Sequence, residues 1–407
     1  MTTETELLRA VAADLDDRDA WQVYLDWLLE REDPRAELCR LQMSLEDADD
    51  EREVKELNTQ INSLIDQQGE TWLTGVDALN LPVRWAMHRG VVGHVAGTPP
   101  ALAANARKIL AAAPLLMAIQ VEAWRNNSDR DLAPLAGSPL LARAREITLH
   151  GDTKRLTGWH HLITPEVRSL ELSSLSFAAE DLTALVAHPW PHLEALKFTG
   201  CSFNKHAIDP LAKLKAPKLV RFDLAAGHLG PSLGAVLAAL PKLRYLRIPG
   251  NEINSEALAL LRPKLGQLTY LDLRGNALAG PDIAPLLKAI PRVSVLKLGG
   301  NDLGTEAVEA IAAWPGAKRL TWLDVAFDSD RGAEALANSE HLSLALERLM
   351  LGMSRLTPAM EHALLDAPRL ANARIYAGKL LGRKKRQAEL AAATKAANKP
   401  KPKPRTM

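Results

Sequence analysis

Residues 268–278 read LTYLDLRGNAL, and their apolar side chains follow a fixed spacing. Leucine stands at the first, fourth, sixth and eleventh positions of this stretch, and asparagine stands at the ninth. The same spacing begins again at residues 243 and 293, which lie 25 residues upstream and downstream. Three tandem copies at one period indicate that this chain is built from structural repeats.

Each copy predicts a short strand followed by a turn and a helix. Alternate side chains of a strand point to opposite faces, so Leu271 and Leu273 are expected to face a common core. Asn276 follows the strand, where its amide can bond turn backbone groups that would otherwise be buried without partners. Residues 283–290 carry apolar side chains at helical spacing and predict a helix on the outer face.

The spacing resembles that of leucine-rich repeats, L-x-x-L-x-L-x-x-N-x-L. The first apolar position recurs at intervals of 23 to 28 residues, which predicts eleven coils. They begin at Leu116, Ala144, Val167, Leu193, Leu219, Leu243, Leu268, Val293, Leu320, Leu346 and Leu370. Intervals near 25 leave room for a true helix, so the coils resemble ribonuclease-inhibitor-like repeats. The resemblance implies an α/β fold, a horseshoe-shaped right-handed leucine-rich repeat solenoid with parallel inner strands and convex helices, preceded by a small all-α domain.

The asparagine position of the repeat predicts a ladder of small polar side chains. From the fourth coil onward it is occupied by Cys201, Gly227, Asn251, Asn276, Asn301, Asp328 and Ser354. A thiol suits such a ladder, so Cys201 is expected to be structural and not a nucleophile.

Residues 21–42, WQVYLDWLLEREDPRAELCRLQ, carry a second pattern, with core residues Tyr24, Asp26, Trp27, Leu28, Glu30, Arg31, Asp33, Pro34, Arg35 and Glu37. This pattern resembles the bacterial repeat-companion domain, a short helical module found ahead of leucine-rich repeats. That family has no established activity, so the resemblance implies an architecture and no reaction. Asp26 and Glu30 lie four residues apart on one helix face, as paired carboxylates do in some acid–base sites. We favour capping and surface ion pairs for these charges, with Asp33 as the N-cap and Pro34 as the first residue of a helix.

Charge and composition predict four segments. They are a repeat-companion helical domain at 1–45, an acidic helical linker at 46–70, the solenoid with a degenerate N-terminal cap at 71–378, and a basic, disordered tail at 379–407. Residues 1–56 hold 18 Asp and Glu against 7 Lys and Arg, a net charge of −11. The tail holds 10 Lys and Arg against one Glu, a net charge of +9.

Composition excludes several classes of function. Two distant cysteines provide no disulfide framework or zinc ribbon, which fits a reducing compartment. The acidic N-terminus is unlike a secretory signal, and no apolar run is long enough for a membrane span, so a cytoplasmic protein is expected. Adjacent His160 and His161 point apart and make a poor metal site. No phosphate-binding or metalloprotease motif is present. The sequence thus predicts no cofactor, no metal and no enzyme.

The third, fifth and seventh residues of each coil are expected on the concave face. The third-position column reads Arg221, Tyr245, Tyr270, Val295, Trp322 and Arg348. Tyr, Trp and Arg are enriched at binding hot spots, although aromatic residues also suit strands for packing reasons. The fifth-position column alternates in sign, Lys197, Asp223, Arg247, Asp272, Lys297 and Asp324, and predicts an ion-pair ladder. The predicted partner-binding residues are Arg221, Tyr245, Arg247, Tyr270, Arg274, Trp322 and Arg348.

These features favour a monomeric, non-enzymatic scaffold that binds another protein on its concave face. The basic excess of outward positions in the C-terminal half predicts an acidic patch on that partner. The alternative is a nucleic-acid-associated protein that binds through the basic tail, because phosphate contacts depend chiefly on Lys and Arg density. A weaker alternative, by fold analogy, is a regulator of a signalling enzyme such as a GTPase.

Overall fold

The structure is a computed structural model with two compact units, Met1–Tyr270 and Leu271–Met407. It describes residues 3–15, 17–47, 51–123, 131–152, 156, 162, 164–204, 206–241, 243–327, 329–352, 354, 356–379 and 381. His160, His161, Asp328 and nearly all of the basic tail lie outside the described residues. The segment boundaries predicted at 45, 70 and 378 stay predictions.

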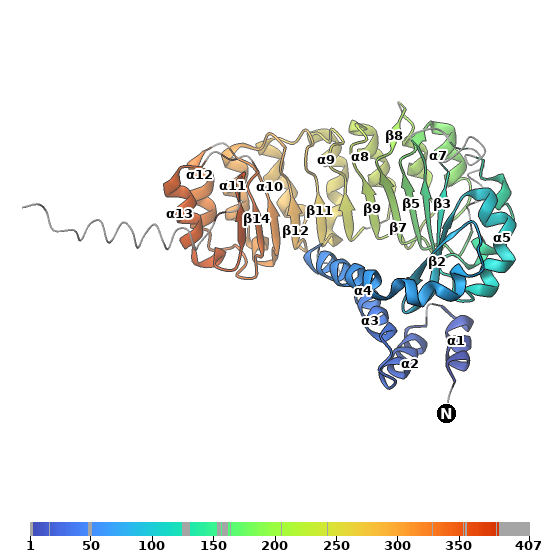
Figure 1. Cartoon of the computed structure of the whole chain (residues 1–407). Helices are drawn as coiled ribbons and strands as arrows, with labels where there is room; N and C mark the ends of the chain where they lie inside the picture. Colours follow the sequence, from blue (N-terminus) through green and yellow to red (C-terminus); the bar gives the residue numbers. More distant parts are fainter. Residues whose placement is uncertain are drawn as a thin grey trace, which may run out of the picture. The chain divides into compact units, whose positions relative to one another are not determined.

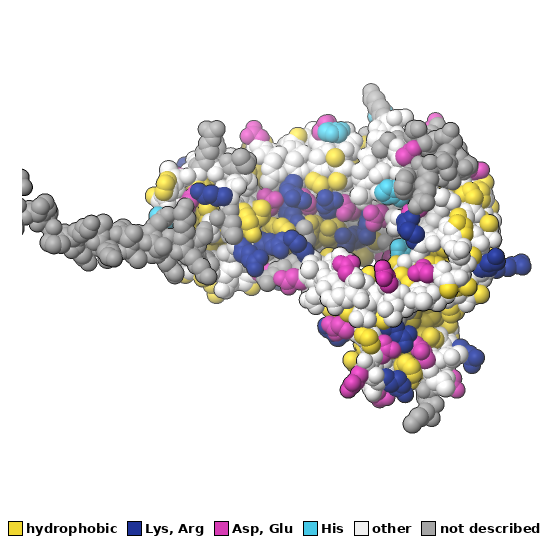
Figure 2. Space-filling view, viewed as in Figure 1, with side chains coloured by type: hydrophobic (Ala, Val, Ile, Leu, Met, Phe, Trp, Pro, Cys, Tyr) yellow, Lys and Arg dark blue, Asp and Glu magenta, His cyan; other side chains and the backbone are white. Residues whose placement is uncertain are grey.

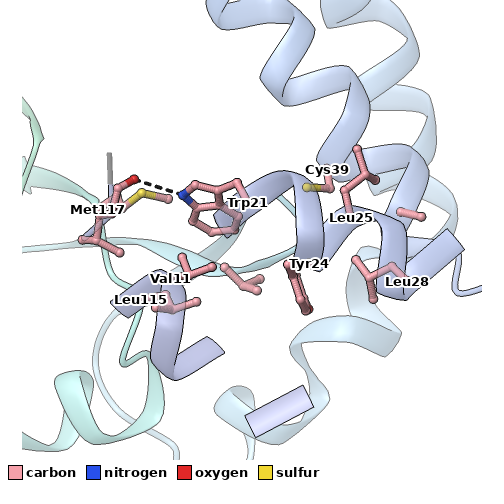
Figure 3. Packing of buried hydrophobic residues seen from close by; sticks show 11 residues of the cluster. Val11, Trp21, Tyr24, Leu25, Leu28, Cys39, Leu115 and Met117 are labelled. Atoms are coloured by element: carbon pink, nitrogen blue, oxygen red, sulfur yellow. Dashed lines mark hydrogen bonds between the residues drawn. The ribbon is translucent and has the colours of Figure 1, made fainter. Parts of the chain in front are cut away.

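The first unit begins with four helices, α1 (Glu4–Ala13), α2 (Arg18–Leu29), α3 (Arg35–Asp47) and α4 (Glu51–Asp77). Thr3 and Glu6 form a capping box at the start of α1, and the Asp17 side chain caps α2. Trp21 and Tyr24 are fully buried in a core that also contains Leu115 and Met117 from the strand region (Figure 3). The helices therefore pack directly on the following part of this unit.

The charged cluster of the N-terminal helices makes structural contacts. Arg35 pairs with Glu4 at 2.8 Å and with Asp33 at 2.7 Å. The hydroxyl of Tyr24 donates to Glu4 at 3.0 Å, which ties α1 to α2. Asp33 also accepts the backbone N–H of Arg35 at 2.9 Å. The third helix begins at Arg35 and not at Pro34, but the predicted capping role of Asp33 is confirmed.

A mostly parallel sheet forms the centre of the first unit (Figure 1). Only its first two strands, β1 (Arg84–His88) and β2 (Val91–Gly97), are antiparallel to each other among the strand pairs described. The strands that follow are β3 (Ala118–Glu122), β4 (Glu146–His150), β5 (Ser169–Ser173), β7 (Ala195–Thr199), β9 (Arg221–Leu224) and β10 (Tyr245–Arg247). Two short strands, β6 (Ser176–Phe177) and β8 (Ser202–Phe203), pair separately.

Helices connect these strands and cover one face of the sheet. They are α5 (Pro99–Ala112), η2 (Ala133–Leu135), α6 (Pro139–Arg143), α7 (Ala179–Val186), η4 (Asp209–Lys213), α8 (Gly230–Ala239), α9 (Ser255–Leu261) and η5 (Arg262–Gln267). In Figure 1, α8 and α9 lie side by side along the strands. Strand β11 (Tyr270–Asp272) contains the division between the units.

The second unit repeats the same arrangement. Its parallel strands are β12 (Val295–Lys297), β13 (Trp322–Asp324), β14 (Arg348–Met350) and β15 (Arg374–Tyr376). Its helices are α10 (Gly280–Ala289), α11 (Gly304–Ala312), η6 (Pro315–Arg319), α12 (Asp330–Ala337), α13 (Pro358–Asp366) and η7 (Pro368–Leu370). Strand, turn and helix recur at the predicted spacing behind an N-terminal helical region. The predicted leucine-rich repeat fold is confirmed.

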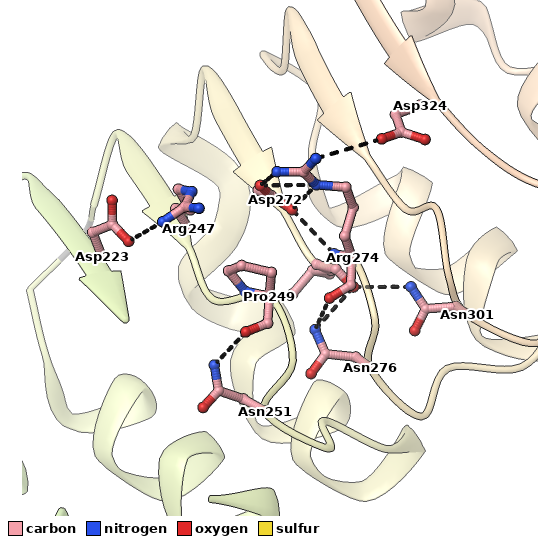
Figure 4. A network of polar contacts seen from close by, with 10 residues as sticks. Asp223, Arg247, Pro249, Asn251, Asp272, Arg274, Asn276, Asn301 and Asp324 are labelled. Carbon is pink, nitrogen blue, oxygen red and sulfur yellow. Dashed lines mark hydrogen bonds and ion pairs between the residues drawn. The ribbon is translucent and has the colours of Figure 1, made fainter. Parts of the chain in front are cut away.

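The inward positions and the asparagine ladder follow the repeat. Leu271 and Leu296 are completely buried. The amide of Asn251 donates to Leu224 O at 2.8 Å and to Pro249 O at 3.0 Å (Figure 4 shows the bond to Pro249). Its oxygen accepts Gly227 N–H at 3.1 Å. A Cβ at residue 227 would lie 2.7 Å from that oxygen, which explains the glycine in this coil. The ladder thus joins each turn to its neighbour.

The other ladder positions behave in the same way. Asn301 donates to Leu273 O at 2.9 Å and Leu298 O at 2.7 Å. The thiol of Cys201 donates to Leu172 O at 3.1 Å, and the Ser354 hydroxyl donates to Leu351 O. Cys201 therefore has the structural role predicted for it.

The predicted register is wrong in the last coil. Counting from Leu370 placed Tyr376 at the seventh position, but Tyr376 pairs with Met350 and Arg374 pairs with Arg348. Arg374 is therefore the third-position residue. The reason is local, because Leu370 ends the turn η7 instead of leading into the strand, which adds two residues to this return segment.

No helix within the described ranges combines the length and the apolar character that crossing a membrane requires.

Candidate partner-binding face

The first unit brings three predicted site residues into one stack. Arg221, Tyr245 and Tyr270 come from adjacent strands β9, β10 and β11. The Arg221 guanidinium lies 3.8 Å from the centre of the Tyr245 ring, and the two tyrosine rings stack with centroids 4.0 Å apart. Tyr270 is only 3% exposed, and burial raises the pKa of Tyr245. The stack is a preformed, largely dehydrated surface feature.

A charged row runs beside this stack. Arg247 pairs with Asp223 at 2.8 Å, and Lys197 lies 3.8 Å from Glu171 (Figure 4 shows the first pair). Burial raises the pKa of Asp223 despite the neighbouring Arg247 guanidinium, which acts in the opposite direction. The predicted opposite charges on β9 and β10 are therefore in contact.

The second unit holds Trp322 between two cations. Lys297 Nζ lies 3.7 Å from the centre of the Trp322 ring, and the Arg348 guanidinium lies 4.4 Å from it. Trp322 is 9% exposed and Lys297 is 1% exposed. The indole N–H of Trp322 is buried and has no hydrogen-bond partner among the described residues. Strand alternation predicted that the Trp322 side chain would be exposed to solvent. Instead, the two cations cover its ring through cation–π contacts.

Arg274 links two aspartates of the second unit (Figure 4). It contacts Asp272 at 2.7 Å and lies 3.9 Å from Asp324. Asp272 is fully buried, and burial raises the pKa of Asp324. Arg274 itself keeps 39% of its side chain exposed, so its outer edge remains accessible from solvent.

The sequence did not predict a cleft that the first unit contains. One wall comes from α3 and α4 through Leu45, Val54 and Asn58, and the other comes from the strand face. The cavity volume is about 570 Å³. A second cavity of about 400 Å³ shares part of its lining. Figure 2 shows basic side chains gathered on the strand face with acidic side chains among them.

Three arginines of the cleft lining were not predicted, although they share one position of the repeat. The second position of several coils, just before each strand, carries Arg145, Arg168 and Arg244. Only the third, fifth and seventh positions were expected to form the binding face. The second position lies at the N-terminal end of each strand, and there it lines the same cavities as residues of the N-terminal helices.

The ionisable side chains that line the two cavities are mostly basic, and Glu146 and Glu194 are the carboxylates among them. No group of three or more His, Cys, Asp or Glu side chains has metal-binding geometry among the residues that the structure describes. Burial raises the pKa of the Cys201 thiol to about 11, which keeps it protonated at neutral pH. What the face offers is positioned guanidinium groups, aromatic surface and a few carboxylates.

Comparison with protein families gives one match. Residues 293–312 match the model of a leucine-rich repeat family, and this segment contains strand β12 and helix α11. No curated protein matches the chain.

Several solved structures are similar to this chain. An internalin from Listeria monocytogenes is 17% identical with a TM-score of 0.40, and the alignment covers 59% of this chain and 68% of the internalin. TLR13 in a complex with ssRNA13 is 16% identical with a TM-score of 0.40, over 65% of this chain and 35% of TLR13. The plant peptide hormone receptor RGFR1, in complex with RGF2, is 14% identical with a TM-score of 0.31, over 64% and 46%.

Proposed function

We propose that this protein is a non-enzymatic scaffold that binds another protein through the strand face of its repeats. The observation that supports the proposal best is the stack of Arg221, Tyr245 and Tyr270, which holds a guanidinium in place before any partner arrives. The proposed contact residues are Arg221, Tyr245, Arg247, Tyr270, Arg274, Trp322 and Arg348.

The physical argument is preorganisation. A side chain that is already ordered loses little conformational entropy on binding, so more of its contact energy appears as affinity. Arg221 stacked on a ring and Arg348 beside Trp322 are held in this way. Each planar guanidinium still offers N–H donors at its edge, which suit a carboxylate. The proposed partner therefore presents an acidic patch.

Three further parts of the proposal rest on sequence. The N-terminal helices 1–45 would form a module of the repeat-companion type, the chain would act as a monomer, and it would work in the cytoplasm. The basic tail beyond Gly378 would not take part in recognition by the strand face.

A capture experiment from a lysate of the source cells tests the proposal. Tagged full-length protein is compared with Arg221→Ala, Arg348→Ala and a truncation after Gly378. Arg107→Ala is the matched control, because Arg107 is exposed on α5. Retained proteins are quantified by mass spectrometry, and each variant is checked by thermal melting. A specific partner should be lost with the two strand-face variants and kept with the control and the truncation. A partner that is indifferent to both strand-face variants would overturn the proposal.

A further inference from the structure

The cleft of the first unit is enclosed on two sides by elements far apart in the sequence. Val54 and Asn58 of α4 face Tyr245 and Tyr270 of the strand face across it. Its second cavity extends beneath the N-terminal helices to Arg18. The two cavities share Glu146, Ser169, Glu194 and Ala195, so they adjoin each other, and together they are called the cleft here.

Basic side chains outnumber carboxylates in the lining of this cleft. Lys197 and six arginines line it, against Glu146 and Glu194. The six arginines are Arg18, Arg89, Arg145, Arg168, Arg221 and Arg244. In a partly enclosed site these charges repel one another, and an anionic ligand relieves that repulsion.

The arginines of the cleft differ in whether a carboxylate pairs with them. Arg168 pairs with Glu194 at 3.1 Å, and Arg145 pairs with Glu166 at 3.2 Å. In contrast, neither Arg221 nor Arg244 forms an ion pair with a described carboxylate, although Arg221 interacts electrostatically with Asp223 on the same strand. The Nε of Arg221 is buried and has no hydrogen-bond acceptor among the described residues. These two arginines are the natural contacts for an incoming acid.

We infer that this cleft binds an extended acidic peptide segment of the partner protein. The inference rests on the proposed function and specifies its recognition element. The lining runs from Glu146 on β4 to Tyr270 on β11, across six successive strands. Five spacings of about 4.8 Å give about 24 Å, and an extended peptide rises about 3.4 Å per residue. The cleft therefore accommodates about seven residues.

The lining favours a peptide over a nucleic acid. Bases bind single-strand sites by stacking on free aromatic faces. Here Tyr245 lies between Arg221 and Tyr270, and Tyr270 is nearly buried. Glu146 and Glu194 would also repel a uniformly charged phosphate backbone. A peptide can alternate carboxylates with apolar side chains, and Leu45 and Val54 offer apolar contacts on the opposite wall.

Fluorescence polarisation with the full-length protein tests this inference. The probe is a labelled seven-residue peptide of alternating Glu and Leu, compared with a Lys–Leu peptide of the same length and with heptauridylate. We expect the Glu–Leu peptide to bind, the Lys–Leu peptide not to bind, and the affinity to fall as salt is raised. Arg244→Glu should weaken binding by about tenfold or more, whereas Arg107→Glu, a matched charge reversal on α5, should leave it unchanged.

The opposite wall supplies an independent check. Val54 is partly exposed on α4, so a charged residue there does not disturb the core. Val54→Glu should weaken binding of the Glu–Leu peptide, and Val54→Lys should strengthen it. Equal affinity of these two variants, or no binding of the Glu–Leu peptide to the parent chain, would overturn the cleft assignment. Tighter binding of heptauridylate with the same dependence on Arg244 would overturn it in favour of a nucleic-acid site. A strand-face partner captured under either result would leave the proposed function standing.

Discussion

Replacing Asn251 by alanine should destabilise the first unit by about 3 kcal/mol. Asn251 is completely buried, and its amide makes at least three hydrogen bonds to backbone groups of two successive coils. Each such bond contributes about 1 kcal/mol net, and removing the side chain leaves its three backbone partners buried. Asn251→Asp should cost at least as much, because a carboxylate would face the carbonyls of Leu224 and Pro249.

Urea unfolding followed by circular dichroism measures this loss. Repeat arrays do not always unfold in a single step. The free energy of the first unfolding transition is therefore compared between the variant and the parent chain. Asn372→Ala is the matched control, since Asn372 is exposed and makes one bond, to Leu344 O at 3.1 Å. It should change stability by no more than about 0.5 kcal/mol. If Asn251→Ala costs no more than Asn372→Ala, the ladder does not hold the coils together.

Four more predictions follow from burial and charge. Leu271→Ala and Leu296→Ala, each at a completely buried position, should each cost about 2–5 kcal/mol in urea unfolding, and no loss in either would mean that the inward positions are misplaced. Tyr270→Ala should lower the melting temperature as well as partner affinity, because Tyr270 is 3% exposed and stacks on Tyr245; an unchanged melt would contradict that packing. Burial raises the pKa of Asp223 above 3.8, so the folded state binds the proton of this carboxyl more tightly than the unfolded state does. The contribution of Asp223 to the free energy of unfolding therefore falls as the pH rises from 3.8 through the pKa of the folded state. Asp223→Asn should therefore gain stability relative to the parent chain as the pH rises through that window. If urea unfolding at several pH values gives a constant difference in unfolding free energy between the two chains, the pKa of Asp223 is not raised. If the tail binds nucleic acid, gel shifts should weaken steeply with salt, truncation after Gly378 should abolish them, and a chain that shows no shift at low salt would remove this alternative.

The repeat pattern predicted the fold because it is a local signal. Leu271 and Asn276 each occupy a position defined by neighbours a few residues away, and the same chemistry recurs at 25-residue intervals. Where the local signal changed, the prediction was wrong. Leu370 has the right residue type for a first position, but it ends a 3₁₀ turn, and the strand after it is displaced by two residues.

The burial of the aromatic column was not predictable from alternation alone. Alternation places Tyr270 and Trp322 on the face away from the helices, but exposure depends on which side chains lie on the neighbouring strands. Strands about 4.8 Å apart bring side chains of the same column into contact. Tyr270 is therefore covered by Tyr245, and Trp322 is covered by Arg348 of the same column. Lys297, from the fifth-position column of the neighbouring strand, also covers the Trp322 ring.

The cleft could not be predicted from the sequence, because parts of the chain that are far apart in the sequence form it. Val54 and Tyr245 are separated by nearly two hundred residues, and no periodicity relates an N-terminal helix to a later strand. The arginines at the second position could have been noticed as a column. Their importance appears only once residues of the N-terminal helices are known to line the same cavities.

The stacking geometry changes which interactions are expected to drive recognition. In a hot spot built on an open ring, most of the affinity comes from burying aromatic surface. Here most of the Tyr245 and Tyr270 surface is already buried in the free protein, so little apolar area remains for a partner to cover. What remains is the outer edge of Arg221, whose guanidinium lies 3.8 Å from the centre of the Tyr245 ring and cannot be fully solvated on that side. Lysine would keep the charge at this position but lose the planar stack and the paired donors. The rings therefore act mainly as a platform that orients arginine, and recognition on this face should depend on carboxylates and on ionic strength more than on apolar contact.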